Sequence, residues 1–257
     1  MSAILALTVE NSIATLVLDR PAVGNTIDMS LARALVDATV RCDEDEAIRC
    51  VVLTGRGRLF CGGGDVSAFA GAGDDLSAFL RELAGVLHEA ISRLKLMKKP
   101  LVVLVNGPAA GAGLSLALAG DITLAARSAH FTAAYGALGL TPDGGMTWSL
   151  PRLVGYRRAQ EIILGNRRVS AEEAAAIGLV TRVLADDALE AAGAELAANL
   201  ARASTAALGA ARQLLLDSFD AQLEDQLERE AQAIAAAGAT PEARAAIAAF
   251  LAKRHKK

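Results

Sequence analysis

Two glycine-rich loops hold the main-chain groups of this chain that are best suited to chemistry. Residues 60–65 read FCGGGD and residues 106–113 read NGPAAGAG, and each loop follows a stretch that predicts a buried strand. Glycine lets backbone N–H groups approach a ligand without a side chain in the way, and a loop that opens a helix leaves its first N–H groups unpaired. Two such loops side by side could hold one developing oxyanion between two main-chain donors.

Neither loop has a common phosphate-binding fingerprint. The second loop continues as GAGLSL and lacks the third glycine of GxGxxG, and no GxxxxGK[ST] motif occurs in the chain. A nucleotide cofactor is therefore not supported. Taken alone, either loop is also consistent with ordinary turn chemistry.

One carboxylate, Asp143, lies in a turn sequence of its own. The stretch GLTPDGGMTW, residues 139–148, places it after Pro142 and before two glycines. Proline followed by aspartate and glycine is typical of a β-turn, and an aspartate here could also cap the following helix. The local sequence favours a turn or cap role, while an acid/base role stays open.

Nucleophile and metal motifs are absent from the sequence. There is no GxSxG, Cys61 has no evident histidine partner, and the three histidines, His88, His130 and His255, have no metal-ligand spacing. We therefore expect no bound metal, and we interpret His88 as a partly buried residue in the middle of a helix.

The elements that must position these residues alternate between strand and helix. ILALTVE and IATLVLD predict a hairpin, CVVLTG and LVVLV predict buried strands, and residues 76–97 predict a long amphipathic helix. ITLAA and GLVTRVL predict two further strands, so the pattern indicates an α/β protein. Residues 101–120 carry no charge, but Asn106, Gly107 and Pro108 interrupt them, which argues against a membrane span.

From Asp186 onward the sequence is rich in alanine and predicts amphipathic helices only. We therefore expect a core over residues 1–185 and a helical C-terminal region over residues 186–257. The apolar faces of these helices could cover the core or form a subunit interface.

Composition excludes some partners. The 257 residues carry a net charge of -3 and 4% aromatic residues, which gives no footprint for nucleic acid. Cys42, Cys50 and Cys61 lack zinc-ligand spacing and are typical of reduced thiols in a cytoplasmic protein. The first 20 residues contain Glu10 and alternate apolar with polar side chains, unlike a secretory signal.

The ordered motifs FCGGGD, VNGPAAGAGLSLALAGDITLAARSAHF, LGLTPDGGMTWSLPRLVG and SAEEAAAIGLVTRVL resemble the crotonase family, the enoyl-CoA hydratase/isomerase superfamily. The resemblance covers almost the whole chain. It implies a spiral of ββα repeats with a helical C-terminal trimerisation region, and a homotrimer or dimer of trimers. It also implies an enzyme acting on acyl-CoA thioesters, with coenzyme A arriving as part of the substrate and no separate cofactor.

The resemblance assigns the family's two oxyanion-hole N–H donors to Gly64 and Ala112. It places Gly62, Asp65 and Val66 along the coenzyme A or pantetheine channel. Tyr135 would shape the acyl pocket, with an ordinary packing aromatic as the alternative. Arg20, in LDRP, would approach the adenine or phosphate end of coenzyme A, and an ordinary solvated arginine is the alternative.

The catalytic side chains distinguish branches of the family. Hydratases of the family carry two glutamates at the positions that Ser115 and Tyr135 occupy here, and neither residue is a good base near neutral pH. Asp143 matches the acid/base of isomerase branches, and the motifs most resemble the ring-1,2-epoxyphenylacetyl-CoA isomerase branch of phenylacetate breakdown. We therefore expect an isomerase in which Asp143 is the single acid/base, with Leu138, Leu140 and Trp148 as an apolar lining.

Three alternatives stay open at this point. The first is hydration by an atypical arrangement, and the second is a non-catalytic acyl-CoA-binding homologue. The third is the 4-chlorobenzoyl-CoA dehalogenase branch, which has Asp at the position of Asp143 and His at that of His88. Gly64 and Tyr135 replace the large aromatic residues that this branch uses, so isomerisation is preferred.

Overall fold

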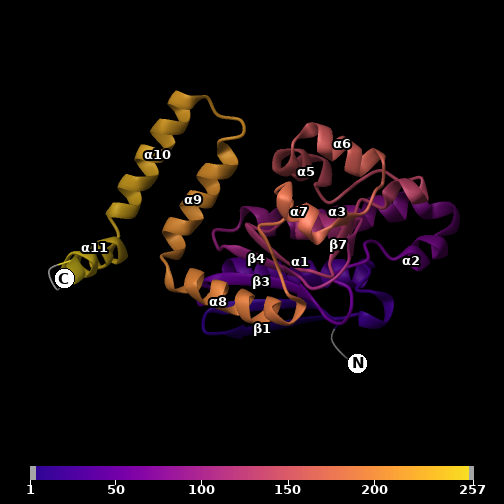
Figure 1. The fold of residues 1–257 in the computed structure, drawn as a ribbon, viewed down its shortest axis with the longest axis horizontal. Helices are drawn as coiled ribbons and strands as arrows, with labels where there is room; N and C mark the ends of the chain where they lie inside the picture. The colour runs from indigo at the N-terminus through magenta and orange to yellow at the C-terminus, as the bar shows by residue number, and fades with distance from the viewer. Residues whose placement is uncertain (1–3, 255–257) are drawn as a thin grey trace.

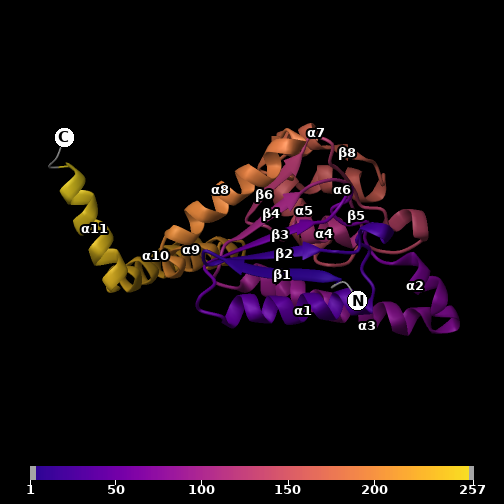
Figure 2. The ribbon, with the colours of Figure 1, turned by 90° about the horizontal axis from the view of Figure 1, so that it is seen from below.

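The structure, a computed structural model, describes residues 4–254 and is organised around a six-stranded sheet with the order β1-β2-β3-β4-β6-β9. β1 is antiparallel to β2, and every other neighbouring pair is parallel. Figure 2 shows β1, β2, β3, β4 and β6 side by side in this order. The strands are β1 Leu5–Glu10, β2 Ile13–Leu18, β3 Cys50–Gly55, β4 Leu101–Val105, β6 Ile122–Ala126 and β9 Arg182–Leu184.

The predicted hairpin and the predicted central strands are confirmed. Asn11 and Ser12 join β1 to β2 with φ values of 51° and 63°, the left-handed region that a tight two-residue hairpin turn requires. All five residues of β4 are buried, as expected for a parallel strand that is covered on both faces. The β-branched runs therefore lie at the centre of the sheet.

A second, three-stranded sheet carries the second glycine loop. It consists of β5 Ala109–Ala110, β7 His130–Thr132 and β8 Val169–Ser170, in the order β5-β7-β8. The uncharged segment of residues 101–120 is divided among β4, β5 and the short helix α4 Ala112–Ala117. Within residues 4–254, no helix combines the length and the apolar character needed to cross a membrane.

Two long helices, α1 Met29–Glu44 and α3 Leu76–Leu96, pack against each other, and Figure 2 shows both beyond the β1 edge of the large sheet. Asp28 caps α1, because its Oδ1 accepts a hydrogen bond from the Leu31 N–H at 2.8 Å. The other helices before residue 186 are α2 Val66–Gly71, α5 Met146–Val154, α6 Tyr156–Leu164 and α7 Ala171–Ala176, with 3₁₀ turns η1 Pro21–Val23, η2 Gly73–Asp75 and η3 Tyr135–Leu138.

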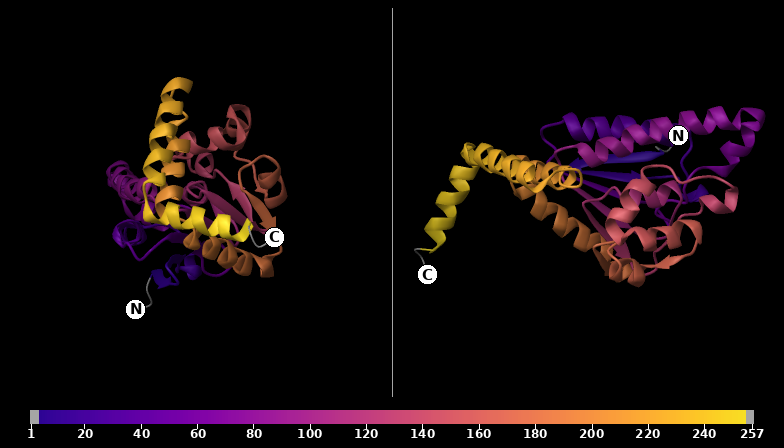
Figure 3. Two further views of the ribbon diagram at one scale, coloured as in Figure 1. Left: turned by 90° about the vertical axis from the view of Figure 1, so that its left-hand side faces the viewer. Right: turned by 90° about the horizontal axis from the view of Figure 1, so that it is seen from above.

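The described chain after residue 185 contains helices and their connections but no strand. It forms η4 Asp186–Ala188, α8 Leu189–Arg202, α9 Thr205–Asp217, α10 Leu223–Gly238 and α11 Pro241–Arg254. α8 packs on β2, β3, β4 and β6, whereas α10 and α11 extend away from the sheets (Figures 1 and 3). The division into a core and an associating helical region stays a prediction, and His255 lies outside the described residues.

Candidate active site

The two glycine loops lie against each other. Cys61 and Ala109 form a parallel bridge, and the Ala110 N–H donates to the Cys61 carbonyl at 3.0 Å. Gly113 is required for this approach, because a Cβ there would lie 2.2 Å from the Cys61 oxygen. The close contact therefore fixes the start of α4 beside the loop that contains Gly64.

A cavity of about 300 Å³ opens between these loops, and both predicted oxyanion donors line it. Within the described residues, neither the Gly64 N–H nor the Ala112 N–H donates a hydrogen bond to the protein. Most of the remaining wall is apolar and includes Phe69, Leu138 and Leu140. The cavity thus combines two available main-chain donors with an apolar lining.

Asp143 lies on the wall of the same cavity and is held by contacts from three other elements. The Tyr135 hydroxyl, in η3, donates to Asp143 Oδ1 at 2.5 Å. The Ser115 hydroxyl, in α4, donates to the Asp143 carbonyl at 2.9 Å. The Gly144 N–H donates to Nε2 of His88, in α3, at 2.9 Å. Packing from three directions therefore fixes the position of the carboxylate.

A turn is present at Asp143, but Asp143 is its first residue instead of following Pro142 within it as the sequence suggested, and the proposed helix cap is also wrong. The Met146 N–H donates to the Asp143 carbonyl at 3.1 Å, whereas the carboxylate does not cap α5, whose N-cap residue is Gly145. Gly144 has φ +61°, and a Cβ there would lie 2.7 Å from the Ser115 Cβ. The glycine lets the turn press against α4 and leaves the carboxylate on the cavity wall.

The electrostatics of the site keep Tyr135 protonated. Burial, together with the neighbouring Asp143 carboxylate, raises the pKa of Tyr135 well above its ordinary value. Tyr135 therefore acts as a hydrogen-bond donor to Asp143. Among the described residues that line the cavity, Asp143 is the one carboxylate.

Cys61 has no nucleophilic role in this arrangement. It is fully buried, its Sγ donates to the Asn25 carbonyl at 3.1 Å, and burial raises the pKa of the thiol to about 12. A buried thiol that keeps its proton is a poor nucleophile.

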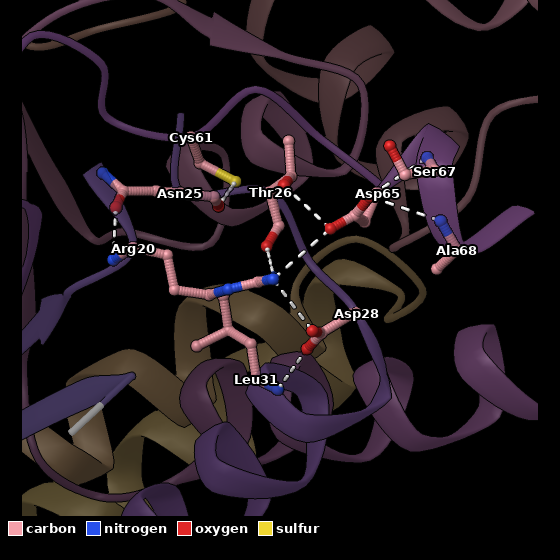
Figure 4. A network of polar contacts seen from close by, with 9 residues as sticks. All are labelled: Arg20, Asn25, Thr26, Asp28, Leu31, Cys61, Asp65, Ser67 and Ala68. Carbon is pink, nitrogen blue, oxygen red and sulfur yellow. Dashed lines mark hydrogen bonds and ion pairs between the residues drawn. The ribbon is translucent and has the colours of Figure 1, made fainter. Parts of the chain in front are cut away.

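Arg20 and Asp65 lie outside the lining of this cavity and contact each other (Figure 4). Arg20 pairs with Asp28 at 2.9 Å and with Asp65 at 3.4 Å. The other oxygen of Asp65 accepts from the N–H groups of Ser67 and Ala68 and so caps α2. These contacts give both residues a structural role, and their assignment to coenzyme A stays a prediction.

The other predicted residues are brought together. Gly62, Val66 and Tyr135 line the cavity with Gly64, Ala112 and Asp143. Trp148 does not; it lines a neighbouring cavity of about 490 Å³ between α3, α5 and the C-terminal helices, so its expected place beside Asp143 is wrong.

The sequence interpretation missed how two residues contact the site. His88 was expected to be a partly buried helix residue, but its side chain is 48% exposed. His88 contacts the Asp143 turn from the middle of α3, with its Nε2 3.8 Å from Asp143 Oδ2. Phe69 presses on Gly64 so closely that a Cβ at Gly64 would lie 2.4 Å from the ring. A resemblance to a branch with histidine at position 88 was the one signal for His88, and no motif pointed to Phe69.

The spiral arrangement of parallel strands, with two glycine loops facing a carboxylate, defines the class of crotonase-fold enzymes. The chain belongs to the enoyl-CoA hydratase/isomerase family, whose sequence model matches residues 8–257.

Relatives carry different activities in their names. The 1,2-epoxyphenylacetyl-CoA isomerase of Escherichia coli strain K12 is 38% identical over 250 residues, which cover 96% of this chain and 94% of that protein. A probable enoyl-CoA hydratase of Rhodobacter capsulatus is 39% identical, covering 96% and 94%. The 4-chlorobenzoyl coenzyme A dehalogenase-2 of an Arthrobacter species is 32% identical, covering 95% and 88%.

A crystal structure of an enoyl-CoA hydratase/isomerase homologue from Mycobacterium abscessus superposes with a TM-score of 0.93. Its sequence is 35% identical, and the match covers 97% of this chain and 96% of that one. The family and the fold expected from the sequence are confirmed.

Proposed function

We propose that this enzyme is an acyl-CoA isomerase in which Asp143 alone moves the proton. The observation that carries the proposal is that Asp143 is the one carboxylate among the described lining residues, in the same cavity as Gly64 and Ala112. In this proposal the thioester oxygen accepts hydrogen bonds from both N–H groups. The acyl chain then lies along the apolar wall, within reach of Asp143.

The proposed reaction needs one group that first accepts and then returns a proton. Asp143, as a carboxylate, removes a proton from a carbon of the acyl group, and the electron pair delocalises onto the thioester oxygen to form an enolate. Each oxyanion donor contributes about 3 kcal/mol of transition-state stabilisation. The protonated Asp143 then delivers the proton to another carbon. Atoms and charges balance, with coenzyme A as part of the substrate and no further cofactor.

The contacts of Ser115 and Tyr135, which occupy the positions of the two hydratase glutamates, argue against hydration. Ser115 is 1% exposed, and its hydroxyl donates to the Asp143 carbonyl. Tyr135 donates to the Asp143 carboxylate and holds its own proton tightly. Neither side chain is available as a second base to activate water.

The size and the lining of the cavity favour a compact apolar acyl group. About 300 Å³ beside Phe69, Leu138 and Leu140 suits a ring or a short unsaturated chain. The isomerase from Escherichia coli is named for an epoxyphenylacetyl thioester. We therefore extend the proposal to ring-epoxide or double-bond isomerisation, and to a place in phenylacetate breakdown.

The test is to follow three reactions with the purified enzyme. A β,γ-unsaturated enoyl-CoA should gain the absorbance of a conjugated thioester, and in D₂O the product should be analysed for deuterium at the carbons that exchange. Ring-epoxyphenylacetyl-CoA should be converted to an isomer of equal mass. Crotonyl-CoA should lose its absorbance slowly or not at all, and fast loss would establish hydration instead.

The matched variants are Asp143→Asn and Asp187→Asn. Asp187 is exposed in η4, far along the chain from the site, and serves as the control. We expect Asp143→Asn to lose turnover while it still binds an acyl-CoA, and we expect Asp187→Asn to behave as the wild type. If no acyl-CoA is converted and Asp143→Asn binds unchanged, the chain is a non-catalytic acyl-CoA-binding homologue.

A second candidate is displacement of chloride from an aryl thioester. The 3.8 Å separation between His88 Nε2 and Asp143 Oδ2 favours it, because an imidazole beside a carboxylate nucleophile could activate the water that releases the product. Gly64 and Tyr135 in place of the large aromatics argue against it. Chloride release from 4-chlorobenzoyl-CoA would decide in its favour.

We also propose that the chain forms a trimer or a dimer of trimers through its C-terminal helices. α10 exposes Leu223 at 68% and Ile234 at 75%, more apolar surface than a monomeric helix usually leaves in water. Light scattering of the purified protein would distinguish a monomer, a trimer and a hexamer.

A further inference from the structure

The contact between His88 and Gly144 fixes the protonation state of the imidazole. The Gly144 N–H donates to His88 Nε2 at 2.9 Å, so this nitrogen must be an acceptor. An imidazole with an accepting Nε2 is neutral and carries its proton on Nδ1. The geometry therefore requires neutral His88 with the Nδ1–H tautomer.

His88 Nε2 has a second possible partner nearby, the Asp143 carboxylate. It cannot donate to that carboxylate and accept from the Gly144 N–H at the same time. Asp143 Oδ2 lies 3.8 Å from His88 Nε2, too far for a hydrogen bond but within ion-pair reach. If Nε2 gains a proton, it can no longer accept from Gly144, and it becomes a donor facing a carboxylate. One proton thus converts a contact that anchors the turn into a contact that occupies the acid/base.

We propose that His88 is a positioning residue with two states: neutral, it anchors the turn that presents Asp143, and protonated, it releases Gly144 and pairs with the Asp143 carboxylate. This inference rests on the proposed function only in that Asp143 moves the proton of the reaction.

The surroundings of His88 support Asp143 as the partner of the protonated ring. His88 also lines the cavity of about 490 Å³ that contains Trp148, and from α3 Ser92 and Lys95 line it too. Burial lowers the pKa of Lys95, and its Nζ donates to the Leu118 carbonyl at 2.9 Å. From the far side of that cavity come Asp217, Asp220 and Arg229.

Two of those far-side groups pair with each other, since Asp217 and Arg229 lie 3.5 Å apart. From η3, Tyr135 is directed to the other oxygen of Asp143. In the part of the chain that the structure describes, Asp143 is the carboxylate within ion-pair distance of His88.

The experiment compares His88→Gln with His88→Leu. The glutamine Oε1 can accept from the Gly144 N–H, as Nε2 does, but it cannot take up a proton, whereas leucine can do neither. We expect His88→Leu to lower kcat at pH 8 by about tenfold to a hundredfold with KM little changed, because a small displacement of a reacting group carries such a cost. We expect His88→Gln to retain most of the wild-type kcat.

The pH–rate profile distinguishes this role from a purely structural one, because replacing a purely structural histidine would leave the profile unchanged. Histidines take up a proton between about pH 5 and 8, so wild-type kcat should fall in that range as the pH decreases. In His88→Gln, whose side chain cannot take up this proton, the fall should no longer occur in that range. An unchanged acid limb in His88→Gln, or a loss of kcat as large as in His88→Leu, would overturn the inference.

NMR of the ¹⁵N-labelled enzyme separates this inference from the proposed function. We expect the Nδ1–H tautomer for His88 at pH 8 and a Gly144 amide shift that follows the His88 titration, in the wild type and in Asp143→Asn alike. An Nε2–H tautomer at pH 8 would overturn the role of His88 whatever Asp143 does. Full turnover in Asp143→Asn would overturn the proposed function and leave the NMR result standing.

Discussion

Two aspartates beside the same cavity, Asp65 and Asp143, are held in different ways. The Oδ1 atom of Asp65 accepts from two main-chain N–H groups at the start of α2. Its Oδ2 atom accepts from the Thr26 hydroxyl at 3.3 Å and pairs with Arg20 at 3.4 Å (Figure 4). A cation and three hydrogen-bond donors therefore occupy both oxygens of Asp65.

Asp143 has fewer partners, and they are neutral. Tyr135 donates to one oxygen, and His88, at 3.8 Å, is the nearest ionisable group recorded for the other oxygen within residues 4–254. The side chain of Asp143 is 29% exposed, compared with 15% for Asp65. Both aspartates adjoin glycines in the sequence, so the charge and number of their partners, and not the local pattern, distinguish Asp65 from the proposed acid/base Asp143.

The largest expected effect comes from removing the charge of each aspartate in turn. Asp143→Asn should lower kcat by about 10²- to 10⁴-fold, because the acid/base is lost, with little change in the free energy of unfolding. Asp65→Asn should lower the free energy of unfolding by about 1–3 kcal/mol, because Arg20 loses a charged partner. Steady-state kinetics and urea unfolding of both variants make the measurement. A larger loss of kcat in Asp65→Asn would reverse the comparison.

The next largest effect concerns the cation of the Asp65 network. Arg20→Met should lower the free energy of unfolding by about 2–4 kcal/mol, because it leaves Asp28 and Asp65 without the guanidinium between them. The control is Arg33→Met, whose exposed pair with Glu82 at 3.5 Å should contribute about 0–1 kcal/mol. A rise in KM for acyl-CoA without a loss of stability would instead support the coenzyme A contact predicted for Arg20.

The sequence predicted elements whose pattern is local. The long helix was expected over residues 76–97 and is observed as Leu76–Leu96, because its apolar residues recur at helical spacing and Lys98-Lys99-Pro100 follows its C-terminal end. The strands CVVLTG and LVVLV could be predicted because each is a short run of β-branched and apolar residues. Gly64, Ala112 and Asp143 could be brought to one cavity from sequence because a family resemblance relates the distant segments.

The contacts of the site that could not be predicted are those made across the fold. His88 and Gly144 are separated by 56 residues, and Arg20 and Asp65 by 45 residues. Their meeting depends on how α3, α4 and the loops pack, which no short motif encodes. For the same reason Trp148, only five residues after Asp143, was wrongly expected in the same cavity, although the helical turn of α5 directs it into the next one.

A smaller effect is expected from the neutral donor to Asp143. Tyr135→Phe removes a hydrogen bond to the ionised carboxylate, so protonated Asp143 becomes relatively more favourable. In the His88→Gln background, where the acid limb of the pH–rate profile no longer reports His88, Tyr135→Phe should therefore move that limb to higher pH. The pKa of Tyr135 is raised above its usual value, so Tyr135 contributes no basic limb in the wild type.

The matched control for that variant is Tyr156→Phe. Tyr156 is 69% exposed at the start of α6, outside both cavities, and its loss should leave the profile unchanged. If Tyr135→Phe also leaves the acid limb in place, the short hydrogen bond does not stabilise the form of Asp143 that accepts the proton.

The smallest effect is expected from the neutral hydroxyl donor of the Asp65 network, Thr26. Thr26→Val keeps the methyl group that packs near Gly62 but removes the hydroxyl that donates to Asp65 Oδ2. The free energy of unfolding should fall by about 0.5–1 kcal/mol with kcat unchanged, because the bond is long at 3.3 Å and Arg20 still neutralises the carboxylate. In an Asp65→Asn background the cost of Thr26→Val should shrink toward zero, since the charged acceptor is already gone. An undiminished cost there would mean that Thr26 stabilises the loop by packing, and that the network holds Asp65 through Arg20 and the α2 amides alone.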